Sequence, residues 1–228
     1  IRTNRHHLRR YRMQSKVILT VTAALILFPA LYFFFFEFAA APLGERALLS
    51  IFQSVTPRTA GFNTADLTAM SETGQFLITI LMLIGGSSGS TAGGLKTVTV
   101  AVLLLASVAS ARGQSHVRVF KRSISDRQVR DAMSITVIML VLCFTGAVVL
   151  VADSGLSFLN SLYETASALA TVGLTANVTP LLHLPSKLII IAFMYFGRVG
   201  ILTISLGFLM GDRAVERFRY AETKLLIG

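Results

Sequence analysis

Long apolar runs alternate with short polar segments along this chain. The runs cover residues 17–36, 76–84 with 95–111, 132–152 and 188–211. The first, VILTVTAALILFPALYFFFF, contains no charged residue, and a helix of that length spans about 30 Å, the thickness of the hydrocarbon core of a bilayer. Stretches at 46–60 and 159–171 are more polar and too short to cross. The pattern predicts an all-α membrane protein with four spans.

The positions of the basic residues give this membrane protein an orientation. Of the 21 Lys and Arg residues, 16 fall in segments 1–16, 112–131 and 212–228. Segments 37–74 and 153–187 together contain only Arg46, Arg58 and Lys187. Because positive residues favour the cytoplasmic side, we expect both ends of the chain and segment 112–131 to be cytoplasmic. The net charge of +10 therefore indicates a cytoplasmic face, and we expect no nucleic-acid partner.

Composition agrees with this class of protein. Apolar residues make up 54% of the 228 residues and charged residues 14%, against about 25% charged in soluble domains. The one cysteine, Cys143, lies in an apolar run and cannot form a disulfide within the chain. No His, Cys and Asp cluster or activated serine favours an enzyme, and His183 stands alone in an outer segment.

The two outer segments resemble each other. One reads SIFQSVTPRTAGFNTADL (50–67) and the other SLYETASALATVGLTANV (161–178), and each contains Thr-x-Gly followed by a hydrophobic residue. Gly61 and Gly173 are 112 positions apart, as are Gly85 and Gly197 in the apolar runs that follow. This spacing predicts a repeat of one span, a short re-entrant helix, a Thr-x-Gly loop and a second span.

Such a unit suits a cation. Non-helical backbone at membrane depth must be buried in protein or line a water-filled cavity, and its unpaired carbonyls can replace the hydration shell of a cation. The carboxyl end of a half-helix adds partial negative charge. Anion-binding loops use N–H groups and helix N-termini instead. The Thr-x-Gly loops are therefore candidates for an ion filter, with a plain connecting loop as the alternative.

A glycine-rich stretch, IGGSSGSTAGGLKT (84–97), interrupts the second apolar run. One straight helix over 76–111 would be about 54 Å long, too long for about 30 Å of hydrocarbon, and five glycines in ten residues favour a break. A nucleotide-binding GxxxxGK[ST] loop does not fit, because Leu95 stands where lysine is required. A close helix-packing surface of small residues stays open as an alternative.

Four motifs in the chain resemble the Trk/Ktr/HKT superfamily of K⁺ transporters, most closely the membrane subunit of bacterial Ktr. They are VTPRTAGFNT (55–64), IGGSSGSTAGGLKT (84–97), ALATVGLT (168–175) and FGRVGI (196–201), and the ending RYAETKLLIG (219–228) is also similar. The resemblance implies a pore of four repeats, of which this chain holds the third and fourth. We expect the first two repeats either to be missing from the sequence or to be supplied by a second copy.

The resemblance also implies which residues form the filter and the gate. The third filter loop would be Thr59, Ala60, Gly61, Phe62 and Asn63, and the fourth Thr171, Val172, Gly173, Leu174 and Thr175. The gate would be an intramembrane loop of Gly85, Gly86, Ser87, Ser88, Gly89, Ser90, Thr91, Ala92, Gly93, Gly94 and Lys96. The K⁺-channel signature TVGYG is only partly matched, since Thr175 stands where a second glycine would be. Selectivity for K⁺ over Na⁺ is therefore left open.

Four charged residues lie near these motifs. Arg198 is expected to face the pore and to set a barrier or tether the gate loop, because an intramembrane arginine is costly; an anchor at a helix break is the alternative. Lys96 either contacts the loop's oxygens or extends toward the cytoplasm. Glu164 either attracts cations or is a structural carboxylate. Arg58 is expected to brace the end of a half-helix.

The chain is accordingly divided into a cytoplasmic segment 1–16, a pore repeat 17–111 with intramembrane loop 85–97, a cytoplasmic linker 112–131, a second repeat 132–211 and a cytoplasmic tail 212–228. The expected function is K⁺ uptake across the bacterial cell membrane, with Na⁺ dependence left open. By the resemblance, the partners are the lipid bilayer, a second copy in a homodimer, and a separate cytoplasmic ring that alone binds nucleotide. A Na⁺-permeable relative and a non-conducting scaffold are the rival functions.

Overall fold

The computed structural model describes residues 12–114, 116–120 and 122–200, and within them the chain is almost entirely helical. The predictions for 1–11, the end of the last apolar run (201–211) and the tail 212–228 lie outside these residues. The helices are α1 Met13–Tyr32, which continues into a π-helical turn Phe33–Glu37, α2 Leu43–Val55, α3 Glu72–Leu83, α4 Thr97–Ala111, α5 Asp126–Ser154, α6 Phe158–Leu169, a 3-10 turn Thr179–Leu181 and α7 Leu184–Val199.

Two helices among the described residues are long and apolar enough to cross a bilayer by length and composition. They are α1 with its π-helical turn, 25 residues, and α5, 29 residues. The second apolar run is divided into α3, of 12 residues, and α4, of 15 residues, with residues 84–96 between them. α7 has 16 residues in the described part.

Local signals in the sequence set the ends of α5. Ser125 caps the start, and Gln128 three residues later completes a capping box. The helix ends at Gly155, which has φ of 64°, a left-handed conformation that glycine adopts at little cost. One uninterrupted apolar helix of 29 residues therefore lies between two clear stop signals.

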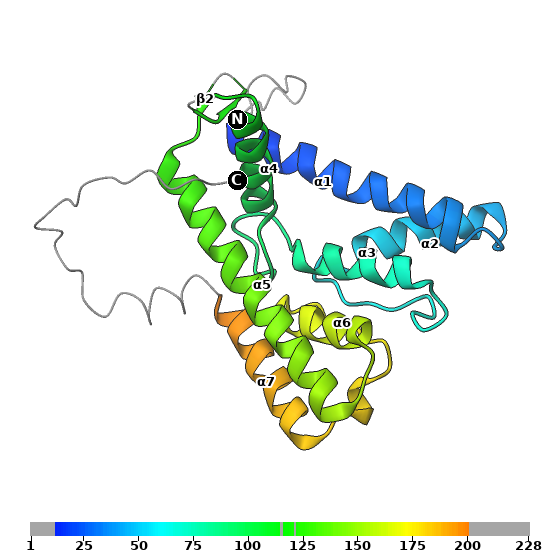
Figure 1. The fold of residues 1–228 in the computed structure, drawn as a ribbon. Coiled ribbons are helices and arrows are strands. Elements are labelled where there is room, and N and C mark those ends of the chain that lie inside the picture. The colour runs from blue at the N-terminus through cyan, green and yellow to red at the C-terminus, as the bar shows by residue number, and fades with distance from the viewer. Residues whose placement is uncertain (1–11, 115, 121, 201–228) are drawn as a thin grey trace, which may run out of the picture.

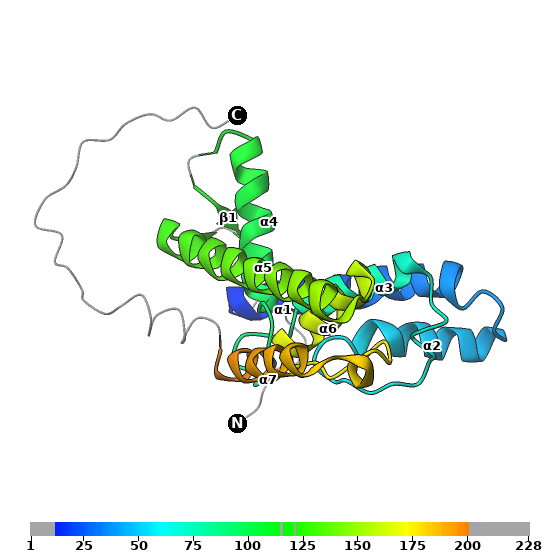
Figure 2. The ribbon, with the colours of Figure 1, turned by 60° about the horizontal axis from the view of Figure 1, so that its bottom comes forward.

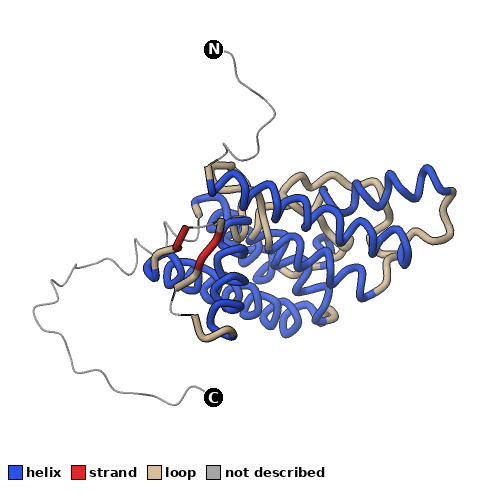
Figure 3. The backbone as a smooth tube through the Cα atoms, turned by 90° about the horizontal axis from the view of Figure 1, so that it is seen from above, coloured by secondary structure: helices blue, strands red, loops and turns tan. Residues whose placement is uncertain are grey.

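The helices form two groups that meet along α3 and α6. α1 packs on α2, and α2 on α3; α5, α6 and α7 pack on one another. α4 contacts α1 and α5 and stands at one end of the molecule beside a short hairpin of β1 Arg118–Val119 and β2 Arg122–Ser123 (Figures 1 and 2). Viewed from above, the two short strands lie at one end of a body built of helices and their connecting loops (Figure 3).

The core is centred on α6. Tyr163, Leu169, Met139 and Leu150 are fully buried there. At Gly146 of α5 an added Cβ would collide with the Phe193 ring, so glycine lets α7 pack closely against α5. This packing encloses α6, which carries the second Thr-x-Gly loop at its end.

Candidate functional site

The two short helices α2 and α6 lead into loops with the same unusual backbone. In the first loop Thr59 has φ of 66° and Gly61 of 73°; in the second Thr171 has 56° and Gly173 has 89°. Positive φ is rare for a β-branched residue and costs about 1–3 kcal/mol. The same strained Thr-x-Gly conformation therefore occurs twice, at positions that the sequence repeat relates.

The two loops lie against each other. A Cβ added at Gly61 would collide with the carbonyl oxygen of Val172, so residues 111 positions apart in the chain are in contact here. The Thr56 hydroxyl fixes the first loop by donating to the Phe62 carbonyl at 2.5 Å. Close contact between the loops thus depends on glycine at position 61.

The second loop begins as the end of α6. The Val172 N–H donates to the Ser167 carbonyl at 2.9 Å, and the Thr171 N–H donates to Ala168 at 3.1 Å. This pair of bonds is a Schellman arrangement, in which glycine is the usual left-handed residue. Thr171 occupies that position here, and its side-chain oxygen accepts a hydrogen bond from the Gly93 N–H.

A buried carboxylate holds the far side of the second loop. Glu164 on α6 is only 4% exposed. It accepts hydrogen bonds from the Thr175 hydroxyl at 2.5 Å, the Thr179 hydroxyl at 2.7 Å and the Ala176 N–H at 3.0 Å. Of the two roles considered for Glu164, these contacts match a structural carboxylate.

The predicted filter residues differ in exposure. In the second loop Val172 and Leu174 are buried, Thr171 and Thr175 are half-buried, and Gly173 is exposed, with open space where a Cβ would lie. In the first loop Thr59 and Gly61 are half-buried, and Ala60, Phe62 and Asn63 are exposed. The second loop is therefore enclosed by this chain and the first is not.

The glycine-rich segment between α3 and α4 is a loop closed at its neck. The Leu95 N–H donates to the Leu83 carbonyl at 2.8 Å, and the Thr97 N–H donates to Gly86 at 3.1 Å. A Cβ at Gly85 would collide with the Gly93 carbonyl oxygen. The chain thus leaves the axis of α3, forms a loop and returns beside its starting point before α4 begins.

This loop touches the second filter candidate directly. The Gly93 N–H donates to the Thr171 side-chain oxygen at 3.2 Å, and a Cβ at Gly93 would collide with the Ala170 carbonyl oxygen. α7 approaches the same place, because a Cβ at Gly197 would collide with the Leu169 carbonyl oxygen. Three segments distant in sequence therefore converge where α6 ends.

Three cationic side chains are directed at carbonyl oxygens of this loop. Lys96 Nζ donates to Ser90 at 3.1 Å and also to Ala92. Arg198 on α7 donates to Thr91 at 3.2 Å. Arg58, which was expected to brace the end of a half-helix, instead reaches the Gly85 carbonyl at 3.5 Å. The successive carbonyls of Ser90, Thr91 and Ala92 are thus all bound by cations.

Sequence reasoning missed two acidic residues that hold the helices after each loop. The Glu37 carboxylate accepts from the Ser71 N–H at 3.2 Å and from the Ser71 hydroxyl, and it lies against Gly74. Asp153 accepts from the Ser186 hydroxyl at 2.5 Å. Glu37 and Asp153 are 116 positions apart, so the 112-residue repeat spacing does not relate them and gave no signal for this site.

Comparison with known proteins identifies the family of this chain. The profile of TrkH, described as a cation transport protein, matches residues 4–216. The chain belongs to the TrkH family. This confirms the family that the sequence motifs indicated.

Curated relatives agree. The chain is 38% identical to the potassium/sodium uptake protein NtpJ of Enterococcus hirae, over 98% of this chain and 52% of that protein. It is 35% identical to the Ktr system potassium uptake protein B of Bacillus subtilis, over 96% of this chain and 50% of that protein. The chain spans about half the length of these relatives.

A solved structure shares the fold. The potassium transporter TrkH from Vibrio parahaemolyticus superimposes with a TM-score of 0.69 at 22% sequence identity, covering 88% of this chain and 44% of that one. The predicted helical membrane-transporter fold is confirmed at this level.

Proposed function

We propose that this chain forms half of a pore that passes K⁺ across the cell membrane, through a filter built in part from 59–63 and 171–175. The observation that carries the proposal is the paired Thr-x-Gly loops, which share positive φ at both residues and meet at Gly61 and Val172. Strain of this kind persists only where the surrounding structure enforces it, and it gathers at functional sites.

The loop geometry suits a dehydrated cation. In each loop the sign of φ alternates, positive at Thr and Gly and not at the residue between them. Alternating handedness turns successive carbonyls toward one side of the backbone, where they can take the place of hydration water. The carboxyl ends of α2 and α6 precede the loops and add partial negative charge. Transport of this kind needs no covalent chemistry.

The loop over 84–96 is the proposed gate. It lies against Thr171 and Ala170 at the start of the second filter loop. Its carbonyls of Ser90, Thr91 and Ala92 are bound by Lys96 and Arg198, and hydrogen bonds to charged donors contribute about 1.5–3 kcal/mol each. Opening would require breaking these bonds and moving a closed loop as a unit.

The remaining filter loops would come from two further repeats. α2 supports this, because its Leu43, Leu48, Ile51 and Val55 are exposed, an apolar face that suits contact with a neighbouring repeat. We further propose a bacterial cell membrane location with both ends of the chain cytoplasmic, a homodimer, and a cytoplasmic regulatory ring that carries the nucleotide site.

Passage of Na⁺ is the second candidate function, because Thr175 stands where a K⁺-channel filter has its second glycine. The relative NtpJ is named for both potassium and sodium uptake, which supports this alternative. The deciding experiment expresses the protein in a host without its own K⁺ uptake systems and measures K⁺ and Na⁺ uptake separately. We expect K⁺ uptake to exceed Na⁺ uptake; equal rates would refute K⁺ selectivity, and no uptake of either when all four repeats are present would favour a scaffold.

A further inference from the structure

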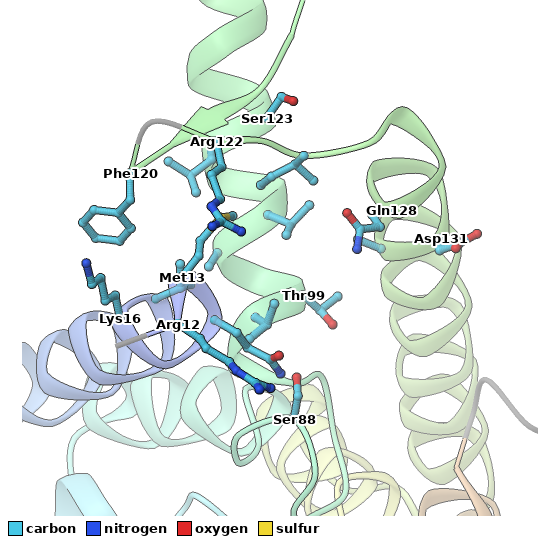
Figure 4. A pocket seen from close by; sticks show the side chains of 18 of the residues that line it. Arg12, Met13, Lys16, Ser88, Thr99, Phe120, Arg122, Ser123, Gln128 and Asp131 are labelled. Carbon is cyan, nitrogen blue, oxygen red and sulfur yellow. The ribbon is translucent and has the colours of Figure 1, made fainter. Parts of the chain in front are cut away.

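A cavity of about 1050 Å³ lies between the start of α1, the side of α4, the β1–β2 hairpin and the start of α5 (Figure 4). It is larger than most small-molecule sites, which run to about 1,000 Å³. The proposed filter and gate do not use it, although Ser88 of the gate loop forms part of its wall.

The rim of the cavity is basic. Arg12, Lys16 and Arg122 line it from two separate elements, and Lys16 also lies over the Phe120 ring at 5.8 Å. Among the lining residues that the structure describes, Asp131 is the one acidic residue, and in Figure 4 its carboxylate points away from the three cations. The balance of charge around the opening therefore favours an anion.

Neutral hydrogen-bond donors accompany these cations. Ser88, Thr99, Ser123 and Gln128 all line the cavity, from four different parts of the fold. Arg12 extends toward Ser88 in Figure 4. Guanidinium groups beside hydroxyls are suited to the oxygens of a phosphate, which arginine binds in a bidentate manner.

The inner wall of the cavity is apolar. Val17, Ala101, Val102, Ile124 and Ala132 are buried lining residues. Beyond the cavity, the three flanking helices expose further apolar side chains: Leu19 on α1, Leu104 on α4 and Val137 on α5. A ligand that is anionic at one end and hydrocarbon at the other would match both parts of this surface.

We propose that the cavity binds an anionic phospholipid of the cytoplasmic leaflet, with its phosphate among Arg12, Lys16 and Arg122 and an acyl chain along α4. The proposal rests on the membrane orientation given above, in which α1 and α5 begin at the cytoplasmic surface. Basic pockets between spanning helices on that side recognise lipid headgroups in this way. Because Ser88 is in the lining, the headgroup would lie beside the gate loop.

The test measures lipid retention directly. The purified protein is transferred to nanodiscs that contain phosphatidylglycerol and phosphatidylcholine, and the lipids that remain bound are counted by native mass spectrometry. A triple variant, Arg12→Gln with Lys16→Gln and Arg122→Gln, is compared with a control triple, Arg112→Gln with Arg118→Gln and Arg127→Gln. The control removes the same charge from the same side of the protein, at residues that do not line the cavity.

We expect the cavity variant to retain about one tenth of the phosphatidylglycerol that the parent retains. Each basic residue near an anionic lipid contributes to the free energy of binding. The control should retain phosphatidylglycerol as the parent does. Equal loss in both triples would overturn the proposal, because general surface charge would then explain retention. Displacement of the lipid by inorganic phosphate or ATP, with no preference for phosphatidylglycerol, would overturn it in favour of a soluble anion.

Two further choices keep the result decisive. If the triple variant does not fold, Arg122→Gln alone changes only an exposed hairpin residue and should show a smaller loss of the same sign; unchanged retention would count against the site. Lipid retention is measured without ion flux, so failure of the K⁺ proposal and failure of the lipid proposal are separate outcomes.

Discussion

Every residue of α6 from Ser161 to Leu169 is buried, whereas α2 buries only Ser50, Gln53 and Ser54. The loop after α6 is fixed by Glu164, by a Schellman pair and by the loop over 84–96, the proposed gate. The loop after α2 exposes Phe62 to 71%. One sequence repeat thus occurs in two environments, and the same strained Thr-x-Gly backbone is present in both.

The two units show that the backbone conformation of the loop depends on its own sequence, whereas its anchoring depends on the surrounding helices. Positive φ occurs at Thr59 after the largely exposed α2 and at Thr171 after the buried α6, so it follows from the shared helix–Thr-x-Gly sequence. Among the described residues, a buried carboxylate accepts hydrogen bonds from the segment that ends the Thr-x-Gly loop only in the unit around α6. The unit around α6 is stabilised from within this chain, and we expect the unit around α2 to depend more on neighbouring repeats.

The largest expected effect distinguishes the two glycines. A Cβ at Gly61 would collide with the Val172 carbonyl oxygen, whereas a Cβ at Gly173 meets nothing within 4 Å. Both have positive φ. We expect Gly61→Ala to lower K⁺ uptake about 100-fold or more, through collision and strain together, and Gly173→Ala to lower it about tenfold, through strain of roughly 1 kcal/mol.

Gly155→Ala is the matched control for this pair. Gly155 also has positive φ and open space around it, but it ends α5 away from both loops. Uptake by this variant should stay at the parent's level. A loss equal to that of Gly173→Ala would show that strain alone, without any role in a filter, lowers uptake.

The next effect concerns the gate loop, which the second unit holds more tightly than the first. Arg198 on α7 binds the Thr91 carbonyl at 3.2 Å, while Arg58 after α2 reaches Gly85 at 3.5 Å, where a hydrogen bond is weak. We expect Arg198→Gln to raise basal K⁺ flux about tenfold, the loss of one charge-assisted bond, and Arg58→Gln about twofold. Flux assays in proteoliposomes measure both.

Two further variants test the interpretation of the gate. Lys187→Gln alters an exposed cation on the same helix as Arg198 and should leave flux unchanged. Deletion of residues 87–93 should raise flux more than Arg198→Gln does. If the deletion leaves flux unaltered, the loop is a packing element and not a gate.

The sequence was sufficient for the family and for the location of these loops, but not for their anchoring. The 112-residue spacing of Gly61 with Gly173 and of Gly85 with Gly197 can be read from the sequence. Glycine indicates positions where the backbone is left-handed or closely packed. The contact of Arg198 with the 84–96 loop was expected from its place in an apolar run, but contacts such as Gly93 with Thr171 or Arg58 with Gly85 join residues 78 and 27 positions apart. They depend on how the helices pack, which no local pattern encodes.

A smaller effect, on stability, tests the anchoring. Glu164→Gln removes the charge that accepts three hydrogen bonds in a buried site. We expect the free energy of unfolding to fall by about 2–3 kcal/mol and K⁺ over Na⁺ preference to weaken. A thiol-reactive fluorophore reports the unfolding, because Cys143 is the chain's one cysteine and only 1% exposed.

Gln53 provides the counterpart in the first unit. Its side-chain amide is buried with no hydrogen-bond partner among the described residues. Gln53→Met should therefore change the unfolding free energy by less than about 1 kcal/mol. A cost at Gln53 equal to that at Glu164 would contradict the difference between the units, because it would show that a neighbouring repeat anchors the first one equally well.

The smallest effect is at Asp66, the carboxylate that follows the first loop. It accepts from the Thr68 N–H at 2.9 Å and from the Thr68 hydroxyl at 2.6 Å, and these bonds hold the pKa of Asp66 below its usual value. A depressed pKa adds stability above the unfolded-state value, and this is lost as the pH falls through the folded-state pKa. Asp66→Asn should thus be slightly less stable than the parent at pH 7, and the two should begin to converge as the pH falls below about 4. A difference that persists at lower pH, measured by thermal unfolding followed by circular dichroism in acid, would mean that Asp66 anchors its loop through more than its charge, as Glu164 does.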